Sequence, residues 1–364
     1  MPCCIKFSRS GVLSRSPALN TGERAHLTHR HGVLAAGCVL AALALRLSNA
    51  AAASHAPLVR YEGTTLSMGC VYAIEAYGSS DAVLRRIVSE AFAEVDRIDR
   101  VMSNYKQDSA LSRINAEAGR HPVTVDPELF DFIAAAMRYS RESGGAFDIT
   151  VGPLMKAWGF FGGDGRMPAG EELAAARRHV GSRHVILNAR ARTVAFDDPG
   201  VELDLGGIAK GYAVDRAAAL LRGQAAAALI SAGGSTIYGL GAPPARDGWD
   251  VAIQDPADGR KVAMTVQLRD RALSVAGTSE KSFEAGGVRY AHIMDPRTGR
   301  PVQGILSVAV LTRTGTAGDA LDDALFVLGP DGSRRYLETL TETDALFFLP
   351  DGEHGWRLVR ESRR

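Results

Sequence analysis

A mixed α+β fold is predicted for the 364-residue chain, with one body of two lobes behind an N-terminal segment of different character. Two observations predict it. Short runs of strand-forming residues, some of them paired as hairpins, alternate with helical patterns along residues 58–361. The composition, 46% hydrophobic and 23% charged, is typical of a globular chain with a large core.

The expected elements follow from local patterns. Apolar residues recur every three or four positions from residue 80 to 102, which predicts a long amphipathic helix. A second helix is expected to begin with Asp126 as N-cap and Pro127 at its first position, and to run to Gly144-Gly145. The other expected elements are a strand-forming run at 64–78, a hairpin at 184–188 and 193–196, strands at 201–205, 227–231, 307–312 and 345–349, and helices at 209–222, 317–328 and 334–340.

Residues 1–53 resemble an export signal. A basic lead that ends at His29-Arg30-His31 precedes an apolar stretch at 32–45, and small residues follow at 48–53. The apolar stretch is shorter than the roughly 20 residues that a permanent membrane-spanning helix needs. We therefore expect a cleaved signal peptide or, as the alternative, an uncleaved inner-membrane anchor, with the mature chain in the periplasm or otherwise outside the cytoplasm.

Charge and cysteine content exclude two other classes of protein. Residues 1–50 hold six of the 42 basic residues and one of the 41 acidic residues, so the remainder has 36 basic and 40 acidic residues. A nucleic-acid-binding protein is not expected from this mildly acidic remainder, because no basic stripe is visible. Cys70 is the only cysteine after residue 53, which excludes an intramolecular disulfide or a thiolate metal cluster in the mature chain.

The glycine turn at residues 204–215 (DLGGIAKGYAVD) is the first candidate for chemistry. A predicted strand delivers Asp204 to two glycines that open a helix, and the free N–H groups of a helix start suit an anion. Lys210 adds a positive charge for a phosphate. The alternative is an ordinary strand-to-helix turn, with Lys210 in solvent.

A pair of aspartates is the second candidate. Asp319 and Asp323 are four residues apart and therefore share one face of the helix predicted at 317–328. Hard oxygen ligands suit Mg²⁺ or Ca²⁺, whereas the alternative is that both carboxylates favour the helix dipole at the first turn. Asp322 points to another face, where we expect it in solvent.

His292 and Phe147 each have two interpretations. His292 precedes a tight Asp-Pro-x-x-Gly turn, so it is either a general base or a structural histidine within a strand. Phe147 follows the second predicted helix and either stacks on a planar ring or fills the core.

The order and spacing of six segments resemble the FAD:protein FMN transferase (ApbE) family over roughly residues 60–350. The six segments are Met68-Gly69, residues 102–105 with 108–115, 145–148 with 152–154, 204–215, 292–299 and 319–329.

The resemblance implies an ApbE-like catalytic domain that uses FAD and Mg²⁺. It would transfer FMN to a Thr or Ser hydroxyl of an exported or membrane-bound redox subunit, with release of AMP. His292 would be the base and Asp319 would hold the metal. The implied FAD-lining residues are Met68, Tyr105, Ala146, Phe147, Asp148, Asp204, Lys210, His292 and Ile293, and the implied metal ligands are Asp319, Asp323 and a carbonyl near Gly207.

Four positions differ from the usual family pattern, namely Cys70, Ser235, Glu280 and Asp323, of which Asp323 replaces a threonine. Because these changes lie near the implied site, two alternatives stay open. One is a hydrolase that splits FAD into FMN and AMP, and the other is a non-catalytic flavin-binding protein. An acceptor motif such as Asp-x-x-Thr-Gly-Ala-Thr in a redox subunit would favour the transferase.

Overall fold

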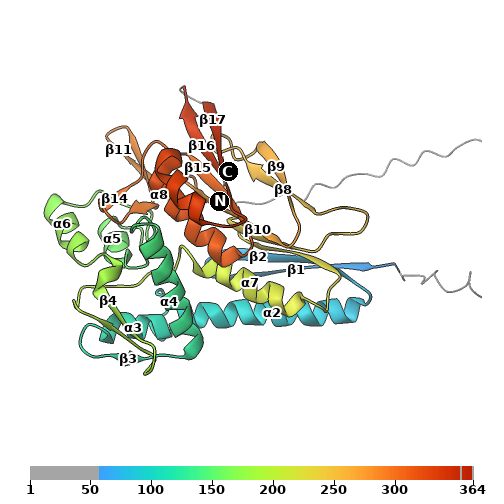
Figure 1. Ribbon diagram of the computed structural model, residues 1–364, viewed down its shortest axis with the longest axis horizontal. Coiled ribbons are helices and arrows are strands. Elements are labelled where there is room, and N and C mark those ends of the chain that lie inside the picture. Colours follow the sequence, from blue (N-terminus) through green and yellow to red (C-terminus); the bar gives the residue numbers. More distant parts are fainter. Residues whose placement is uncertain (1–56, 353–354, 363–364) are drawn as a thin grey trace, which may run out of the picture. The chain divides into compact units, whose positions relative to one another are not determined.

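An eight-stranded antiparallel sheet organises the computed structural model, which describes residues 57–352 and 355–362 (Figure 1). The expected signal segment at 1–53 lies outside the described residues. Neighbouring strands of the sheet are antiparallel throughout. In spatial order the strands are β1 (Val59–Ser67), β2 (Cys70–Gly78), β6 (Ala227–Ala232), β7 (Thr236–Leu240), β10 (Arg271–Gly277), β15 (Ser307–Thr312), β16 (Asp344–Asp351) and β17 (Gly355–Ser362).

Smaller sheets and the helices complete the body. The further strands are β3 (Val123–Thr124), β4 (Val185–Asn188), β5 (Thr193–Phe196), β8 (Trp249–Gln254), β9 (Val262–Leu268), β11 (Ser282–Ala285), β12 (Val288–Ala291), β13 (Met294–Asp295) and β14 (Arg300–Pro301). The helices are α2 (Asp81–Met102), α3 (Ala110–Glu117), α4 (Pro127–Glu142), α5 (Gly152–Ala157), α6 (Gly170–Arg178), the 3₁₀ turn η1 (Ser182–His184), α7 (Ala209–Leu221) and α8 (Gly315–Thr339).

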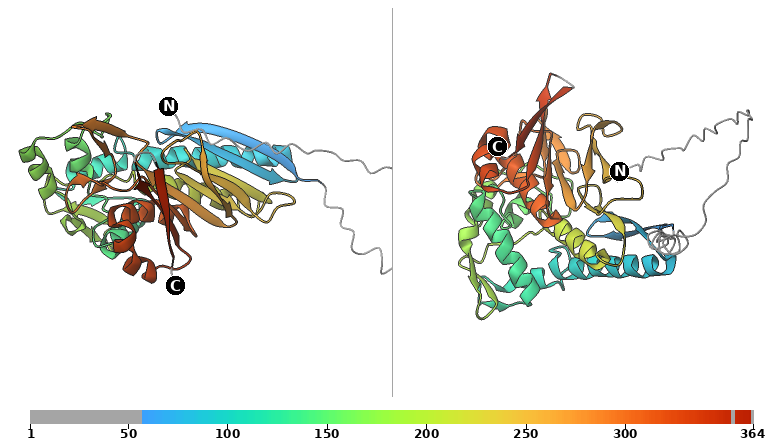
Figure 2. Two further views of the ribbon diagram at one scale, coloured as in Figure 1. Left: turned by 90° about the horizontal axis from the view of Figure 1, so that it is seen from above. Right: turned by 45° about the vertical axis from the view of Figure 1, so that its right-hand side comes forward.

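The main core lies between the sheet and helices α2, α7 and α8. Helix α2 runs alongside β1 and β2, α7 packs on β6 and β7, and α8 packs on β10 and β15 (Figure 2). Ile74 and Ile230 from the sheet meet Leu84 of α2 and Leu325 of α8 in one cluster, with no exposed surface on any of them. Each such side chain contributes about 1.5–3 kcal/mol to folding.

A second lobe gathers α3, α4, α5 and α6 with the three-stranded sheet of β3, β5 and β4 (Figure 1). Its α5–α6 part has a separate apolar cluster around Trp158 and Phe160, whereas the apolar residues of α3 and α4 belong to the main core. The Trp158 indole N–H donates to the carbonyl of Gly299 at 2.8 Å, which fastens this cluster to the turn after His292. The α+β class and the two lobes are therefore confirmed.

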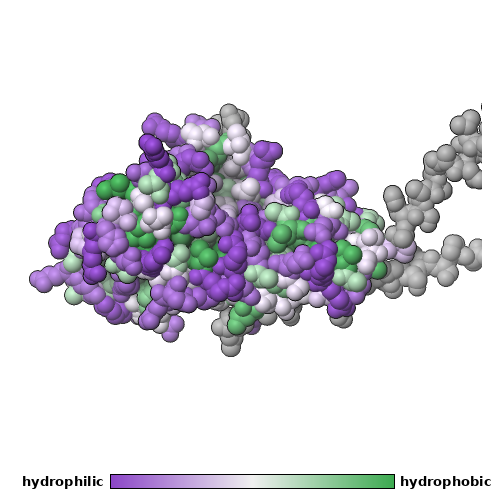
Figure 3. Space-filling view, turned by 90° about the horizontal axis from the view of Figure 1, so that it is seen from below, coloured by the Kyte–Doolittle hydropathy of each residue, from purple (hydrophilic) through white to green (hydrophobic). Residues whose placement is uncertain are grey.

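The surface of the described part is mostly polar. Figure 3 shows a face on which hydrophilic residues predominate and hydrophobic ones form small, separate patches. Among the described helices, none is both long enough and apolar enough to cross a membrane.

Two helices begin where the sequence predicted them. The periodicity placed the first from residue 80, and α2 begins at Asp81 with Ser80 as its N-cap. The Asp126 carboxylate accepts from the backbone N–H of Glu128 at 2.9 Å, and Pro127 is the first residue of α4. The predicted hairpin is β4 and β5, and the predicted helix at 209–222 is α7.

One local prediction was wrong, and two others gain detail from the structure. Residues 201–205 form no strand, because the Asn115 side chain takes up both backbone groups of Leu203, at 2.8 and 2.9 Å. The two helices predicted at 317–328 and 334–340 are confirmed as the two parts of α8, which are separated by the non-helical Gly329 with φ of +66°. The run at 64–78 is a hairpin, because Met68-Gly69 turns the chain between β1 and β2 with φ values of +50° and +74°.

Helices α7 and α8 cross with almost no space between their backbones. A Cβ atom at Gly211 would overlap the carbonyl group of Gly315 and lie 2.8 Å from the backbone N of Thr316. The Asp215 carboxylate accepts from the N–H groups of Gly315 and Thr316 at 2.6 and 2.8 Å, which caps α8 from α7. This crossing sets the position of both helices that carry the predicted site.

Gly211→Ala is expected to destabilise the chain by at least about 2 kcal/mol, because two backbones would have to separate to admit the methyl group. Urea unfolding measures the change. Gly332→Ala, on an exposed part of α8 where a Cβ meets nothing closer than 3.4 Å, is the matched control and should not destabilise. Equal stability of Gly211→Ala and the wild type would show that the crossing is not tight.

A charged network ties α2, α4 and α7 together. Glu94 and Arg97 of α2 pair at 2.8 Å, and Arg216 of α7 reaches Glu94 at 3.0 Å. Glu128 of α4 pairs with Arg97 at 2.8 Å and accepts from the Tyr212 hydroxyl of α7 at 2.7 Å. Hydrogen bonding from Arg97 outweighs burial and lowers the pKa of Glu94 to about 2.

Because the pKa of Glu94 is lower in the folded chain than in the unfolded chain, its ionised form stabilises the fold above about pH 4.5. That stabilisation is lost as the pH falls through about 2. Glu94→Gln should reduce the free energy of unfolding by about 1 kcal/mol near neutral pH and by nearly nothing at the acid end. Urea unfolding at several pH values tests this, and a difference independent of pH would contradict it.

Candidate active site

The predicted site residues come from six separate segments, and the structure brings several of them together near the start of α7. Electrostatic interactions connect Asp204, Lys210, Glu280 and Asp319 to Asp323, and Lys210 to His292. Their positions are the β1–β2 turn (Met68), the segment after α2 (Tyr105), the segment after α4 (Ala146, Phe147 and Asp148), the turn into α7 (Asp204, Gly207 and Lys210), the segment between β12 and β13 (His292 and Ile293), and the N-terminal part of α8 (Asp319 and Asp323).

Asp319 is buried, with 4% of its surface exposed, and its carboxylate is fully oriented by the protein. Oδ2 accepts from the backbone N–H of Gly211 at 2.6 Å. Oδ1 accepts from the hydroxyl of Ser274 at 2.7 Å and from that of Thr236. These three donors fix the orientation of the Asp319 carboxylate near the start of α8.

Asp323 faces the glycine turn. Its Oδ2 atom lies so close to Gly207 that a Cβ atom there would overlap it, so a larger residue at this position would require the carboxylate to move. Burial, followed by the like charge of Asp319, raises the pKa of Asp323 to about 7. The two carboxylates, one helical turn apart, therefore repel each other, and the charge of Lys210 offsets this repulsion only in part.

These residues fit a divalent metal ion. No group of three His, Cys, Asp or Glu side chains suited to a metal occurs in residues 57–352 and 355–362. The fit comes instead from Asp319, Asp323 and the backbone at Gly207, a set of hard oxygen ligands that Mg²⁺ prefers. A cation would relieve the repulsion that raises the pKa of Asp323.

Lys210 lies at the first turn of α7, half-buried among acidic groups. Burial by itself lowers the pKa of Lys210, but the charges of Glu280 and Asp319 outweigh burial and raise it. No carboxylate of the described residues pairs with its ammonium group directly. Lys210 therefore remains charged and available to an anionic ligand.

His292 has one accessible ring nitrogen. Its Nδ1 atom is buried and lacks a hydrogen-bond partner among the described groups, whereas Nε2 is 3.9 Å from the Glu280 carboxylate. Burial lowers the pKa of His292, with Lys210 acting in the same direction and Glu280 against it. The imidazole is therefore mainly neutral at neutral pH and can accept a proton at Nε2.

Tyr105 offers an aromatic surface at the edge of the site. It is 54% exposed and stacks on Phe161, with ring centroids 4.6 Å apart and the rings 8° from parallel. Burial, and then the charge of Asp204, raises the pKa of Tyr105. The sequence did not single out Phe161, because an aromatic residue in a glycine-rich loop carries no distinctive spacing.

Four predicted FAD-lining residues lie inside the protein. The side chains of Ala146, Phe147 and Ile293 are 2–5% exposed and pack in the core. The Asp148 carboxylate accepts from the Ser140 hydroxyl, the Thr150 N–H and hydroxyl, and the Ser182 N–H, at 2.6–3.0 Å. These contacts hold the turn after α4 together. Because they occupy the Asp148 carboxylate, the side chain gives no support to the prediction that Asp148 contacts FAD.

The expectation that Asp322 is in solvent was wrong. Its surface is 5% exposed, because α8 is enclosed by α4, α7, β10 and β15. Burial, together with the charges of Asp323 and Asp319, raises the pKa of Asp322 well above its usual value. The site therefore contains a third carboxyl group that helical spacing alone had placed outside it.

Three of the four departures from the family pattern border the site. Cys70, a free thiol whose pKa is raised by burial, interacts with Lys210. Glu280 faces His292, and Asp323 faces Gly207. Ser235, in contrast, donates to the carbonyl of Ala232 at 3.1 Å within its own turn.

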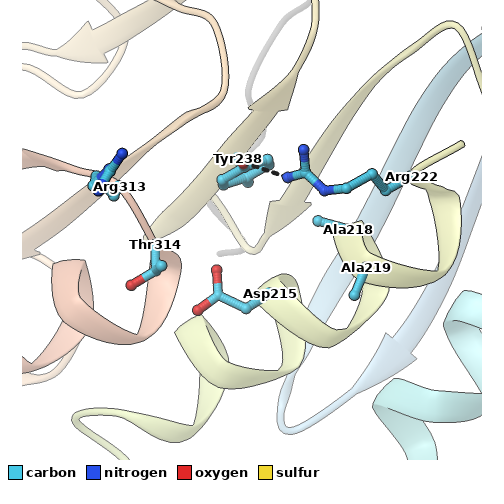
Figure 4. A pocket seen from close by; sticks show the side chains of 7 residues that line it. All are labelled: Asp215, Ala218, Ala219, Arg222, Tyr238, Arg313 and Thr314. Atoms are coloured by element: carbon cyan, nitrogen blue, oxygen red, sulfur yellow. Dashed lines mark hydrogen bonds between the residues drawn. The ribbon is translucent and has the colours of Figure 1, made fainter.

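A separate cavity of about 170 Å³ lies near the C-terminal part of α7 (Figure 4). None of the predicted site residues lines it. Arg222 donates to the Tyr238 hydroxyl across it at 2.9 Å, and Asp215 is engaged in capping α8. The lining residues are Asp215, Ala218, Ala219, Arg222, Tyr238, Arg313 and Thr314.

Fold and site together define an α+β protein with a glycine turn, a lysine and a pair of carboxylates placed for an anionic ligand and a cation. The ApbE family model matches residues 68–347, and the chain belongs to this family.

Curated relatives and solved structures agree with this assignment. An FAD:protein FMN transferase of Treponema pallidum is 35% identical over 308 residues, which cover 80% of this chain and 85% of that protein. One from Vibrio cholerae is 35% identical over 304 residues, covering 80% and 88%. The crystal structure of the ApbE protein from Thermotoga maritima has a TM-score of 0.76 at 31% identity and covers 83% of this chain and 97% of its own.

Mg²⁺ is expected to raise the melting temperature of the chain, because binding to the folded state alone stabilises it by about 2.7 kcal/mol at a hundredfold excess over Kd. Asp323→Asn should reduce this shift, since one ligand charge is lost. Asp331→Asn, an exposed change in the same helix, is the control and should keep the full shift. An identical Mg²⁺ shift in Asp323→Asn and the wild type would remove Asp323 from the metal site.

Proposed function

We propose that this chain transfers FMN from FAD to a Ser or Thr hydroxyl of a target protein and releases AMP. The observation that carries the proposal is the convergence of Lys210, His292 and the Asp319–Asp323 pair at the glycine turn. Membership of the ApbE family supports it, together with the names of the relatives.

The chain's own residues supply binding and orientation. The glycine turn at 206–207 admits a pyrophosphate close to the backbone, and Lys210 offsets its negative charge. Tyr105 offers a face for the flavin ring. Asp319, Asp323 and the backbone at Gly207 would hold Mg²⁺, which when bound supplies Lewis-acid stabilisation of charge on the phosphate oxygens.

The transfer forms one bond to phosphorus and breaks another. The target hydroxyl oxygen forms a bond to the phosphorus of the FMN half, the bond from that phosphorus to the bridging oxygen breaks, and AMP leaves with the electron pair. The hydroxyl proton passes to Nε2 of His292, the nitrogen that faces the open side of the site. Positioning and charge stabilisation account for most of the rate in such reactions.

The location of the enzyme is part of the proposal. The signal-like residues 1–53 support export, so we place the mature chain in the periplasm, with an exported or membrane-bound redox subunit as target.

The test incubates the purified chain with FAD, Mg²⁺ and a redox subunit that carries the acceptor segment Asp-x-x-Thr-Gly-Ala-Thr. A covalently fluorescent acceptor on a denaturing gel, with an equal amount of AMP, is the expected result. Asp319→Ala should abolish labelling, His292→Ala should slow it by about 10²-fold or more, and Asp331→Asn should leave it unchanged.

The other outcomes separate the alternatives. FMN and AMP without a labelled acceptor would identify a hydrolase. Intact FAD that stays bound to the chain would identify a flavin-binding protein without transferase activity.

A further inference from the structure

Two buried hydroxyl groups have no role in the proposed reaction so far. Thr236 of β7 and Ser274 of β10 stand directly opposite each other in the antiparallel pair, and neither has exposed surface. Their hydroxyl oxygens are 3.1 Å apart. Valine has a similar shape and would suit both buried strand positions. A hydroxyl group buried there needs a hydrogen-bond partner, because without one it loses its hydrogen bonds to water.

Their shared partner is one oxygen atom of Asp319. Both hydroxyls donate to Oδ1, whereas Oδ2 is held by the Gly211 N–H at 2.6 Å. Gly318 makes this approach feasible, because a Cβ atom there would lie 2.9 Å from the Ser274 Cβ. Strands β7 and β10 and helix α8 therefore pack closely together around the Asp319 carboxylate.

Anchoring of α8 does not by itself account for the pair. The helix is already fixed by the Asp215 cap and by its crossing with α7 at Gly211. Its apolar residues, Leu321 and Leu325 among them, are also buried in the main core. The crossing supplies one donor, the Gly211 N–H at Oδ2, and the hydroxyl pair adds the donors that hold Oδ1.

We propose that Thr236 and Ser274 are positioning residues, which preorganise the Asp319 carboxylate as a ligand for a divalent cation. The inference rests on the proposed function in taking Asp319 as a ligand. Two donors at Oδ1 restrict the rotation of the carboxylate before the cation arrives. The cation then loses less free energy in ordering the side chain, as is general for residues that orient metal ligands.

The test measures Mn²⁺ binding to the purified chain without FAD, by electron paramagnetic resonance and calorimetry. Thr236→Val keeps the shape of the side chain and removes its hydroxyl, so the Mn²⁺ Kd should rise about 10-fold or more. Ser274→Ala should act in the same direction. Thr236→Ser restores the hydroxyl and should return the Kd to within a few-fold of wild type.

A neighbouring buried hydroxyl provides the matched control. Thr312 of β15 is 2% exposed, and its hydroxyl donates to the carbonyl of Thr314 at 2.8 Å and not to Asp319. Thr312→Val should therefore leave the Mn²⁺ Kd unchanged, even if it lowers the melting temperature. If Thr236→Val does not fold, Ser274→Ala decides the question by the same measurement.

Two results would overturn the inference. One is a folded Thr236→Val or Ser274→Ala chain that binds Mn²⁺ with the wild-type Kd. The other is a wild-type chain that does not bind Mn²⁺. A wild-type chain that binds Mn²⁺ but transfers no FMN would contradict the proposed function, and the expected loss of affinity in Thr236→Val would still support the positioning role.

Discussion

The close crossing of α7 and α8 is the constraint on which the rest of the site depends. Gly211 and Gly315 lack side chains at the point of contact, so the two backbones meet directly. The crossing brings the Gly211 N–H within 2.6 Å of Asp319 and places Lys210, one residue earlier, among the acidic groups of α8. A wider crossing would move Lys210 away from the acidic groups of α8.

Charge in this site is unbalanced in favour of acids. Asp319, Asp322 and Asp323 lie within two turns of α8, and Lys210 is the cation that interacts with all three. Asp319 accepts three hydrogen bonds from the protein, whereas burial and then like-charge repulsion raise the pKa values of Asp322 and Asp323. Such an arrangement costs folding free energy that a bound cation can offset.

The inner and outer residues of the site differ in how many partners hold their side chains. Asp319 accepts three hydrogen bonds inside the protein, and Asp148 accepts four. Tyr105, His292 and Glu280 lie at its open side, where they have few fixed partners. A fixed inner part and a more open outer part suit a reaction in which a small ligand binds first and a protein hydroxyl must then approach.

The sequence by itself determined the elements that local chemistry specifies. Ser80 and Asp126 fixed where α2 and α4 begin, because a cap satisfies backbone groups within three residues. The sequence also determined the family and the residue types of the site, because the glycine turn, the paired carboxylates and their order can be read directly along the chain.

Only the tertiary structure decided which groups surround those residues. The donors that hold Asp319 come from Gly211, Thr236 and Ser274, which are 108, 83 and 45 residues away in the chain. Burial of Asp322 was likewise decided by what packs around α8. Residue spacing records which side chains share a face of one helix, but the contacts between elements form only when the chain folds, and no periodic pattern encodes them.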